Sequence, residues 1–149
     1  MQKLIFLIFL FFLSTCGSPE KKISNQSLSN KDQAIKVYKE GLDAIENYDY
    51  FYASKKFSEA EILLPQSEWA AKSALMVAYC LYSINFYEDA ILNLERYTRT
   101  YPASENLDYA DYLIAISYYE QILDEEKDIE PLLKSKKKIE FFLDKYPNT

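Results

Sequence analysis

Two different patterns of apolar residues divide the chain. Residues 4–13 form an unbroken apolar run, LIFLIFLFFL, which follows a single basic residue, Lys3. From residue 31 onward, apolar residues recur instead at helical spacing. The first such stripe comprises Ala34, Val37, Tyr38, Leu42 and Ile45. No alternation of period two between turn signals is found, so the pattern predicts that the chain after residue 30 is all-α.

Local signals set the expected bounds of the first two helices. The first helix is predicted over residues 31–47, and Ser29 with Asp32 resembles a capping box at its start. The second is predicted over residues 50–63, because Pro65 cannot continue a helix. The spacing therefore predicts a helical hairpin before residue 67.

The N-terminal apolar run predicts an export signal. A helix that crosses a bilayer needs about 20 apolar residues, whereas a shorter run after a basic residue is typical of a signal peptide. We therefore expect residues 1–15 to be a signal peptide. Residues 16–30 follow it, and their polar, serine- and asparagine-rich composition predicts a flexible tether.

The cleavage region resembles the lipobox of bacterial lipoproteins. It reads Leu13-Ser14-Thr15-Cys16, with Thr15 where the motif usually has Gly, Ala or Ser. The resemblance implies that the chain is cut before Cys16 and that this cysteine carries the covalent lipid. Gly17 follows, and an Asp there would resemble the inner-membrane retention signal, so the outer membrane is the implied destination.

The helical part repeats itself. Three segments read Leu64-Pro65-Gln66-Ser67, Tyr101-Pro102-Ala103-Ser104 and Tyr146-Pro147-Asn148-Thr149. In each, a proline can end one helix and a hydroxyl can cap the next. Small and large residues recur at matching offsets before the prolines, in the order and spacing of the tetratricopeptide (TPR) pattern. The expected repeat-packing positions are Gly41, Ala53, Phe57, Ala60, Pro65, Ala78, Ala90, Leu94, Pro102 and Pro147.

These offsets predict a TPR-like α-solenoid of three antiparallel helix pairs, at about residues 31–67, 68–104 and 105–149. Small residues let the two helices of a pair approach closely, and larger residues fill the gap to the next pair. Each pair leaves an apolar face open, so neighbouring pairs must stack. The third pair is longer, and residues 123–130 fit an acidic insertion between its helices.

Composition argues against most catalytic and nucleic-acid-binding functions. The formal net charge is −6, and binding of phosphate backbones needs a basic surface. The chain has no histidine, the usual general base and commonest zinc ligand, and too few glycines for a phosphate-binding loop. We therefore expect no enzyme activity, no nucleic acid, no metal site and no cofactor besides the lipid on Cys16.

Four further features have plain structural interpretations. Cys80 lies within a predicted helix and is expected to be a buried, inert thiol, because no histidine can activate it. Trp69 is expected to pack between the first two pairs. The acidic run at residues 124–128 lacks the spacing of a calcium loop and predicts a solvated loop. The lysines of residues 134–138 predict an exposed helix face.

The whole arrangement resembles the BamD/ComL family of outer-membrane assembly lipoproteins. The resemblance rests on the lipobox, the proline motifs and the junction that runs from Tyr101-Pro102 to Asn106-Leu107-Asp108-Tyr109-Ala110-Asp111-Tyr112. It covers residues 16–149 but only about the N-terminal half of the family's length, since the family has five helix pairs. The chain is therefore expected to be an N-terminal fragment.

The resemblance implies a lipoprotein of the β-barrel assembly machinery at the periplasmic face of the outer membrane. Implied partners are a BamA-like barrel subunit, other assembly lipoproteins and the C-terminal segments of unfolded outer-membrane proteins, with the membrane reached through the lipid. The alternative is another periplasmic TPR lipoprotein that serves as a scaffold for cell-envelope or division complexes.

In a TPR stack, the first helix of each pair lines the concave face. The positions expected to form a peptide-binding groove are Tyr38, Leu42, Lys72, Tyr79, Tyr82, Tyr109, Tyr112 and Tyr119. An extended segment with alternating apolar residues and a terminal aromatic residue would suit tyrosines, and Lys72 could meet its carboxylate. The alternative is that the aromatic stripe is ordinary core.

Overall fold

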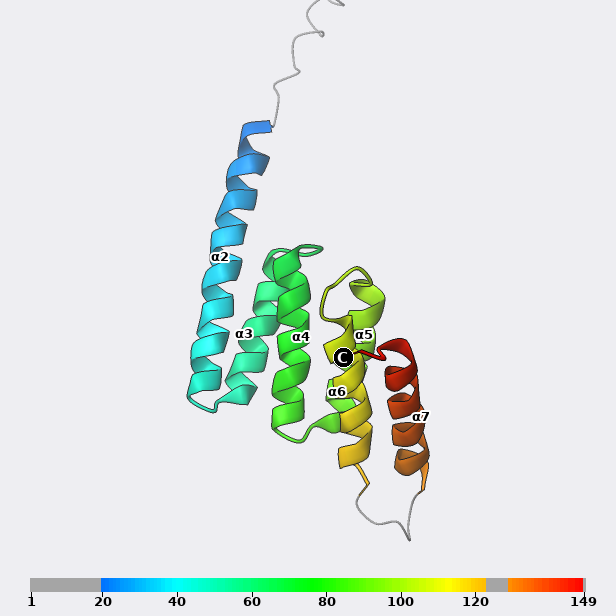
Figure 1. The fold of residues 1–149 in the computed structure, drawn as a ribbon. Coiled ribbons are helices and arrows are strands. Elements are labelled where there is room, and N and C mark those ends of the chain that lie inside the picture. Colours follow the sequence, from blue (N-terminus) through cyan, green and yellow to red (C-terminus); the bar gives the residue numbers. More distant parts are fainter. Residues whose placement is uncertain (1–19, 123–128, 149) are drawn as a thin grey trace, which may run out of the picture.

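The computed structural model describes residues 20–122 and 129–148, with side chains from residue 29 onward. Six helices make up this part of the chain, and it contains no strand (Figure 1). They are α2 (Glu20–Glu46), α3 (Tyr50–Leu63), α4 (Glu68–Ser83), α5 (Tyr87–Thr100), α6 (Leu107–Glu120) and α7 (Glu130–Lys145). The predicted all-α class is confirmed.

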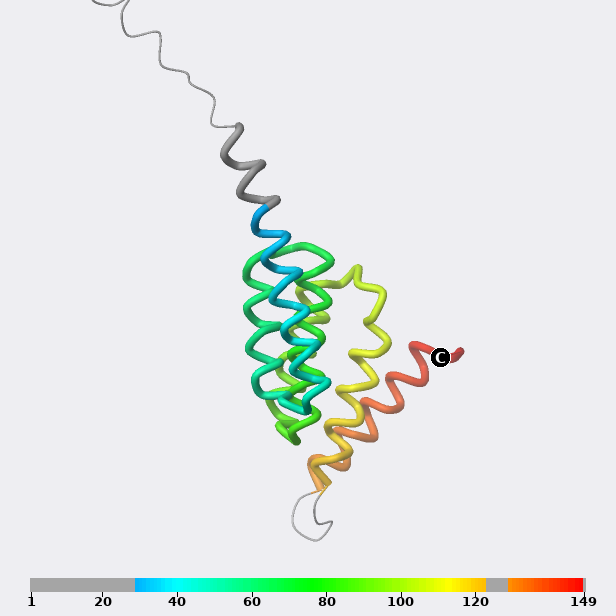
Figure 2. The backbone as a smooth tube through the Cα atoms, turned by 90° about the vertical axis from the view of Figure 1, so that its left-hand side faces the viewer, coloured from blue at the N-terminus to red at the C-terminus, as the bar shows by residue number. Residues whose placement is uncertain are grey.

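The helices form a stack of antiparallel pairs. Each helix packs on the next along the chain, and α2 also contacts α4, as α4 contacts α6. The first helices of successive pairs therefore lie side by side, which is the TPR arrangement that the repeat pattern predicts. Figure 2 shows α6 and α7 tilted away from the first four helices, so the stack twists along its length.

The observed bounds differ from the predicted ones at the N-terminus. The bounds of α3 agree with the predicted second helix, but α2 begins at Glu20 rather than near residue 31. Ser29 and Asp32 therefore lie inside a helix, and the capping-box prediction is wrong. Residues 20–31 contain no proline or glycine, which would interrupt a helix. The helix that packs against α3 therefore extends towards the N-terminus as far as Glu20.

The turns after Pro65 and Pro102 are closed in different ways. Ser67 caps α4 as predicted, because its Oγ accepts a hydrogen bond from the backbone N–H of Ala70 at 3.0 Å. Ser104 does not cap α6, whose N-cap is Asn106 without a side-chain hydrogen bond. The Oγ of Ser104 instead lies 2.5 Å from the hydroxyl of Tyr97 and accepts a hydrogen bond from the backbone N–H of Asn106 at 3.4 Å. Thr149 lies outside the described residues.

The repeat-packing side chains form the core. Ala53, Phe57, Ala78, Ala90 and Leu94 are fully buried, and Ala60 is 1% exposed. One cluster gathers around Phe57 between the first two pairs, and a second gathers around Leu94 between the second and third. Gly41 touches the Phe57 ring directly, while Pro65, Pro102 and Pro147 are exposed in or after the turns.

Cys80 is a fully buried free thiol, as expected. Burial raises its pKa to about 12, so the reactive thiolate is scarce at neutral pH.

Part of what the sequence predicts cannot be placed. The signal peptide, the lipobox with Cys16 and the acidic run at residues 124–128 lie outside the described residues. Among the helices that the structure describes, none combines the length and the apolar character needed to cross a membrane.

Candidate peptide-binding site

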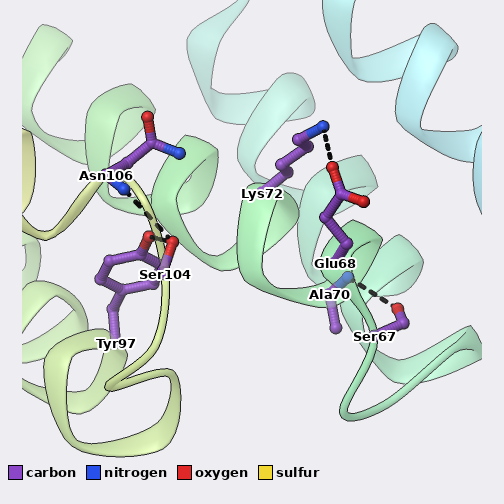
Figure 3. A network of polar contacts seen from close by, with 7 residues as sticks. All are labelled: Ser67, Glu68, Ala70, Lys72, Tyr97, Ser104 and Asn106. Carbon is purple, nitrogen blue, oxygen red and sulfur yellow. Dashed lines mark hydrogen bonds and ion pairs between the residues drawn. The ribbon is translucent and has the colours of Figure 1, made fainter.

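A cavity of about 510 Å³ lies between the two proline turns at one end of the stack. This volume is within the range of sites that hold small ligands or a few side chains. Figure 3 shows Lys72 and Glu68 on α4, opposite the turn that carries Ser104 and Asn106. Its lining residues are Gln66, Ser67, Glu68, Ala71, Lys72, Thr100, Tyr101, Pro102, Ala103, Ser104, Glu105 and Asn106.

Lys72 is the cation of this cavity. Its Nζ lies 2.5 Å from Oε1 of Glu68, one helical turn earlier. That hydrogen bond raises the pKa of Lys72 and lowers the pKa of Glu68, and Tyr38 and Glu105 are close enough to add to the shift of the lysine. Lys72 therefore lies within electrostatic reach of both the first pair and the segment that precedes the third.

A partly buried ion pair lies beside the cavity. The guanidinium of Arg96 donates two hydrogen bonds to the carboxylate of Glu61, at 2.6 and 2.9 Å. The hydroxyl of Tyr101 donates a third, at 2.9 Å. Burial and this carboxylate raise the pKa of Tyr101 to about 12. The network ties Tyr101, which lines the cavity in the turn after α5, to α3 of the preceding pair.

Sequence reasoning missed Glu61. Arg96 and Tyr101 stand out in the motif that carries the family resemblance, but their partner is 35 and 40 residues away. Only the stacking of α5 against the first pair identifies that carboxylate. The structure contains a similar arrangement in the third pair, where Lys145 and the hydroxyl of Tyr146 both bind Asp111, at 2.8 and 3.0 Å.

Four of the predicted groove tyrosines come together between the second and third pairs. We call Tyr79, Tyr82, Tyr109 and Tyr112 the tyrosine surface. Burial raises the pKa of Tyr109, and the hydroxyls of Tyr79, Tyr112 and Tyr82 are near enough to raise it further. The rings of Tyr109 and Tyr112 lie 6.4 Å apart, and these two side chains are 39% and 45% exposed. The two tyrosines of α6 therefore present rings to solvent.

The same tyrosines also support the packing. Tyr79 meets the Tyr50 ring edge-on at 6.3 Å, and Tyr112 lies 5.9 Å from Phe142. Tyr82 lies 5.6 Å from Tyr87. The two interpretations of the aromatic stripe are thus not exclusive, because these rings pack against other aromatic rings while Tyr109 and Tyr112 stay partly exposed.

The other three predicted groove residues do not join this surface. Tyr38 packs edge-on against Phe57 and Trp69, at 5.0 and 5.4 Å, which also confirms that Trp69 lies at the junction of the first two pairs. Leu42 is 38% exposed on α2. Tyr119 is 57% exposed near the end of α6 and makes no ring contact among the described residues.

A stack of helix pairs with a cavity between two turns and accessible aromatic rings defines a helical-repeat protein-binding scaffold. Among the described residues, no group of three or more His, Cys, Asp or Glu side chains could hold a metal ion. Residues 30–149 match the YfiO family model, whose description is outer membrane lipoprotein. The chain belongs to this family, and the resemblance to BamD is confirmed.

Curated relatives bear the name outer membrane protein assembly factor BamD. The protein from Caulobacter vibrioides is 34% identical over 113 residues, which cover 76% of this chain and 37% of the relative. The protein from Rickettsia prowazekii is 30% identical over 149 residues, covering 100% and 58%. The protein from Neisseria gonorrhoeae is 29% identical over 114 residues, covering 76% and 43%. The chain thus spans only about half the length of these relatives.

Proposed function

We propose that this chain is the client-binding part of an outer-membrane protein assembly factor. It receives the C-terminal segments of unfolded outer-membrane proteins, catalyses no reaction, and is held at the periplasmic face of the outer membrane by a lipid on Cys16. The support is its family, the names of its relatives and the resemblance of residues 13–16 to a lipobox. A BamA-like barrel subunit and further assembly lipoproteins are its proposed partners.

The observation that carries the proposal is that Lys72 lies on the same helix, α4, as Tyr79 and Tyr82 of the tyrosine surface. Lys72 and Tyr79 are seven residues apart on α4, so they share a face and are separated by about 10 Å along the axis. An extended segment covers that distance with about three residues. If the C-terminal carboxylate of a client binds Lys72, the preceding residues of the client therefore lie over the tyrosine surface.

The replacement of Glu68 by a client carboxylate at Lys72 costs little free energy. The carboxylate of a client must displace Glu68 from Lys72, and both side chains are well exposed. An exposed ion pair one turn apart contributes only about 0.3–0.5 kcal/mol, so the displacement is cheap. Apolar and aromatic side chains that cover Tyr109 and Tyr112 gain about 25 cal/mol for each Å² removed from water. The affinity thus depends mainly on the rings, and the direction of binding depends on Lys72.

The test is a fluorescence anisotropy titration of the full chain in detergent with a labelled C-terminal peptide of an outer-membrane β-barrel protein. We expect saturable binding, which weakens several-fold with Tyr79→Ala, with Tyr112→Ala and with a peptide whose C-terminus is amidated. Phe51→Ala, which removes an exposed ring on α3, is the matched control and leaves binding unchanged. Absence of saturable binding by a chain with an intact helical circular-dichroism spectrum contradicts the proposal.

A further inference from the structure

A second hollow, of about 330 Å³, lies between α6 and α7, away from the tyrosine surface and the cavity of Lys72. We call it the lysine hollow. It is lined by Tyr118, Lys134, Lys137, Lys138 and Phe141. Its position on α7 matters because this helix has more lysines than acidic residues, whereas the chain as a whole has a net charge of −6.

The lysines of this hollow are available for exchange. Lys134 pairs with Glu130 at 2.7 Å, and both side chains are more than half exposed. Lys138 lies 3.7 Å from Glu95, a loose pair. Exposed ion pairs contribute at most about 1 kcal/mol, so an incoming carboxylate can replace either acid. Lys137 is exposed and makes no ion pair within the described part of the chain.

The hollow also offers apolar contact. The ammonium group of Lys134 lies 5.8 Å from the centre of the Tyr118 ring. Leu133, Lys137 and Phe141 follow one another at four-residue spacing, so they share one face of α7. Leu133 is 57% exposed and Phe141 is 49% exposed. The surface therefore alternates ammonium groups with large apolar side chains, which suits a segment that alternates carboxylates with apolar residues.

The shape of the hollow favours a protein segment over a membrane surface as the occupant. The hollow is lined from two helices, with Tyr118 on α6 and the lysines and Phe141 on α7. A concave site between two helices can take up a side chain that projects from a protein segment, whereas a flat layer of lipid headgroups does not enter it.

We infer that the lysine hollow docks an acidic segment of a partner protein, one in which carboxylates flank an apolar or aromatic residue. The carboxylates pair with Lys134, Lys137 and Lys138, and the apolar residue packs between Tyr118 and Phe141. This interface shares no residue with the tyrosine surface, so a partner bound there leaves the proposed client site open.

The test uses the full chain in detergent and a labelled synthetic peptide that carries two aspartates on each side of a phenylalanine. We expect saturable binding that weakens with added salt and that is lost when the four aspartates are replaced by asparagine. Lys137→Glu lowers the affinity at least fivefold, and Phe141→Ala lowers it at least threefold. Lys39→Glu, the same charge change at an exposed position of α2, is the matched control and changes it less than twofold.

Two results overturn the inference. The first is equal weakening by Lys137→Glu and Lys39→Glu, which assigns the binding to overall charge. The second is failure of the acidic peptide to bind while phosphatidylglycerol vesicles bind in a manner that depends on Lys137, which assigns the hollow to a lipid surface. Because Lys137 is exposed, its replacement keeps the fold, and circular dichroism verifies this.

Discussion

The ring of Phe57 lies so close to Gly41 that a Cβ added at position 41 would stand 2.8 Å from two of the ring carbons. The contact joins α2 to α3, and the Phe57 side chain is fully buried. Real Cβ atoms do not come this close to their neighbours, so the glycine sets how near the two helices of the first pair can lie.

Gly41→Ala should therefore destabilise the fold, although in an exposed helix the same change stabilises by about 1 kcal/mol. We expect a net loss of about 1–2 kcal/mol, because the enclosed ring has no room to move. Urea unfolding followed by circular dichroism measures this. The double variant Gly41→Ala with Phe57→Leu should recover part of the loss, and a stability at or above wild type for Gly41→Ala contradicts the packing described.

The ion pair between Glu61 and Arg96 should couple the first two pairs. Glu61→Gln weakens two charge-assisted hydrogen bonds from Arg96 and one from Tyr101, so we expect a loss of about 1–2 kcal/mol. Glu59→Gln is the matched control, because its exposed contact with Lys56 at 3.5 Å should be worth less than about 0.5 kcal/mol. A double-mutant cycle with Arg96→Met should show about 1 kcal/mol of coupling, and strict additivity rules the network out.

High pH should lower the free energy of unfolding, because the fold favours the neutral form of Cys80 and Tyr101. Burial raises the pKa of Cys80 from 9.0 to about 12 in the folded chain. The unfolded chain therefore loses this proton first, and the stability that the buried thiol contributes is full below pH 9 and decreases as the pH rises towards 12. The hydroxyl of Tyr101, raised from 10.0 to about 12, acts in the same sense from pH 10.

The measurement is the free energy of unfolding in urea, at pH 8 and at pH 10.5, for wild type and Cys80→Ala. We expect this free energy to fall by about 1–2 kcal/mol more in wild type than in the variant between the two pH values. Equal losses in the two proteins mean that Cys80 is not the group that titrates.

Tyr48 has a left-handed backbone with φ of 60° although its side chain is 81% exposed. The matching position in the next pair is Asn85, with φ of 63°. Asparagine tolerates this region better than a bulky residue. Tyr48→Asn should therefore raise the free energy of unfolding by about 0.5–1 kcal/mol, and Asn85→Tyr should lower it by a similar amount. Thermal unfolding compares them, and a decrease for Tyr48→Asn refutes the backbone argument.

The sequence predicts the stack well because its packing is local and periodic. Ala78 and Leu94 occupy their predicted places because a fixed offset from a proline determines which face of a helix a residue takes. The start of α2 is not predictable in this way, since a polar stretch without glycine or proline suits both a tether and an exposed helix.

The polar contacts are less predictable than the packing. Ser67 and Ser104 occupy the same place in the proline motif, but only Ser67 caps a helix, because α4 begins directly after Ser67 whereas α6 begins three residues after Ser104. Only some of the predicted groove residues belong to the tyrosine surface. Tyr109 on α6 lies near Tyr79 on α4, whereas Tyr38 on α2 packs against Trp69. Which side chains meet depends on the angle between neighbouring pairs, and the sequence of one repeat does not determine that angle.

The most direct test of the central claim is to locate a bound client. A C-terminal peptide of an outer-membrane β-barrel protein, with a photoreactive benzophenone at its third residue from the end, is crosslinked to the full chain and mapped by mass spectrometry. We expect crosslinks to α4 and α6 around Tyr79, Tyr109 and Tyr112, which an excess of unlabelled peptide removes. Crosslinks confined to the outer face of α3, around Phe51 and Ile62, contradict it.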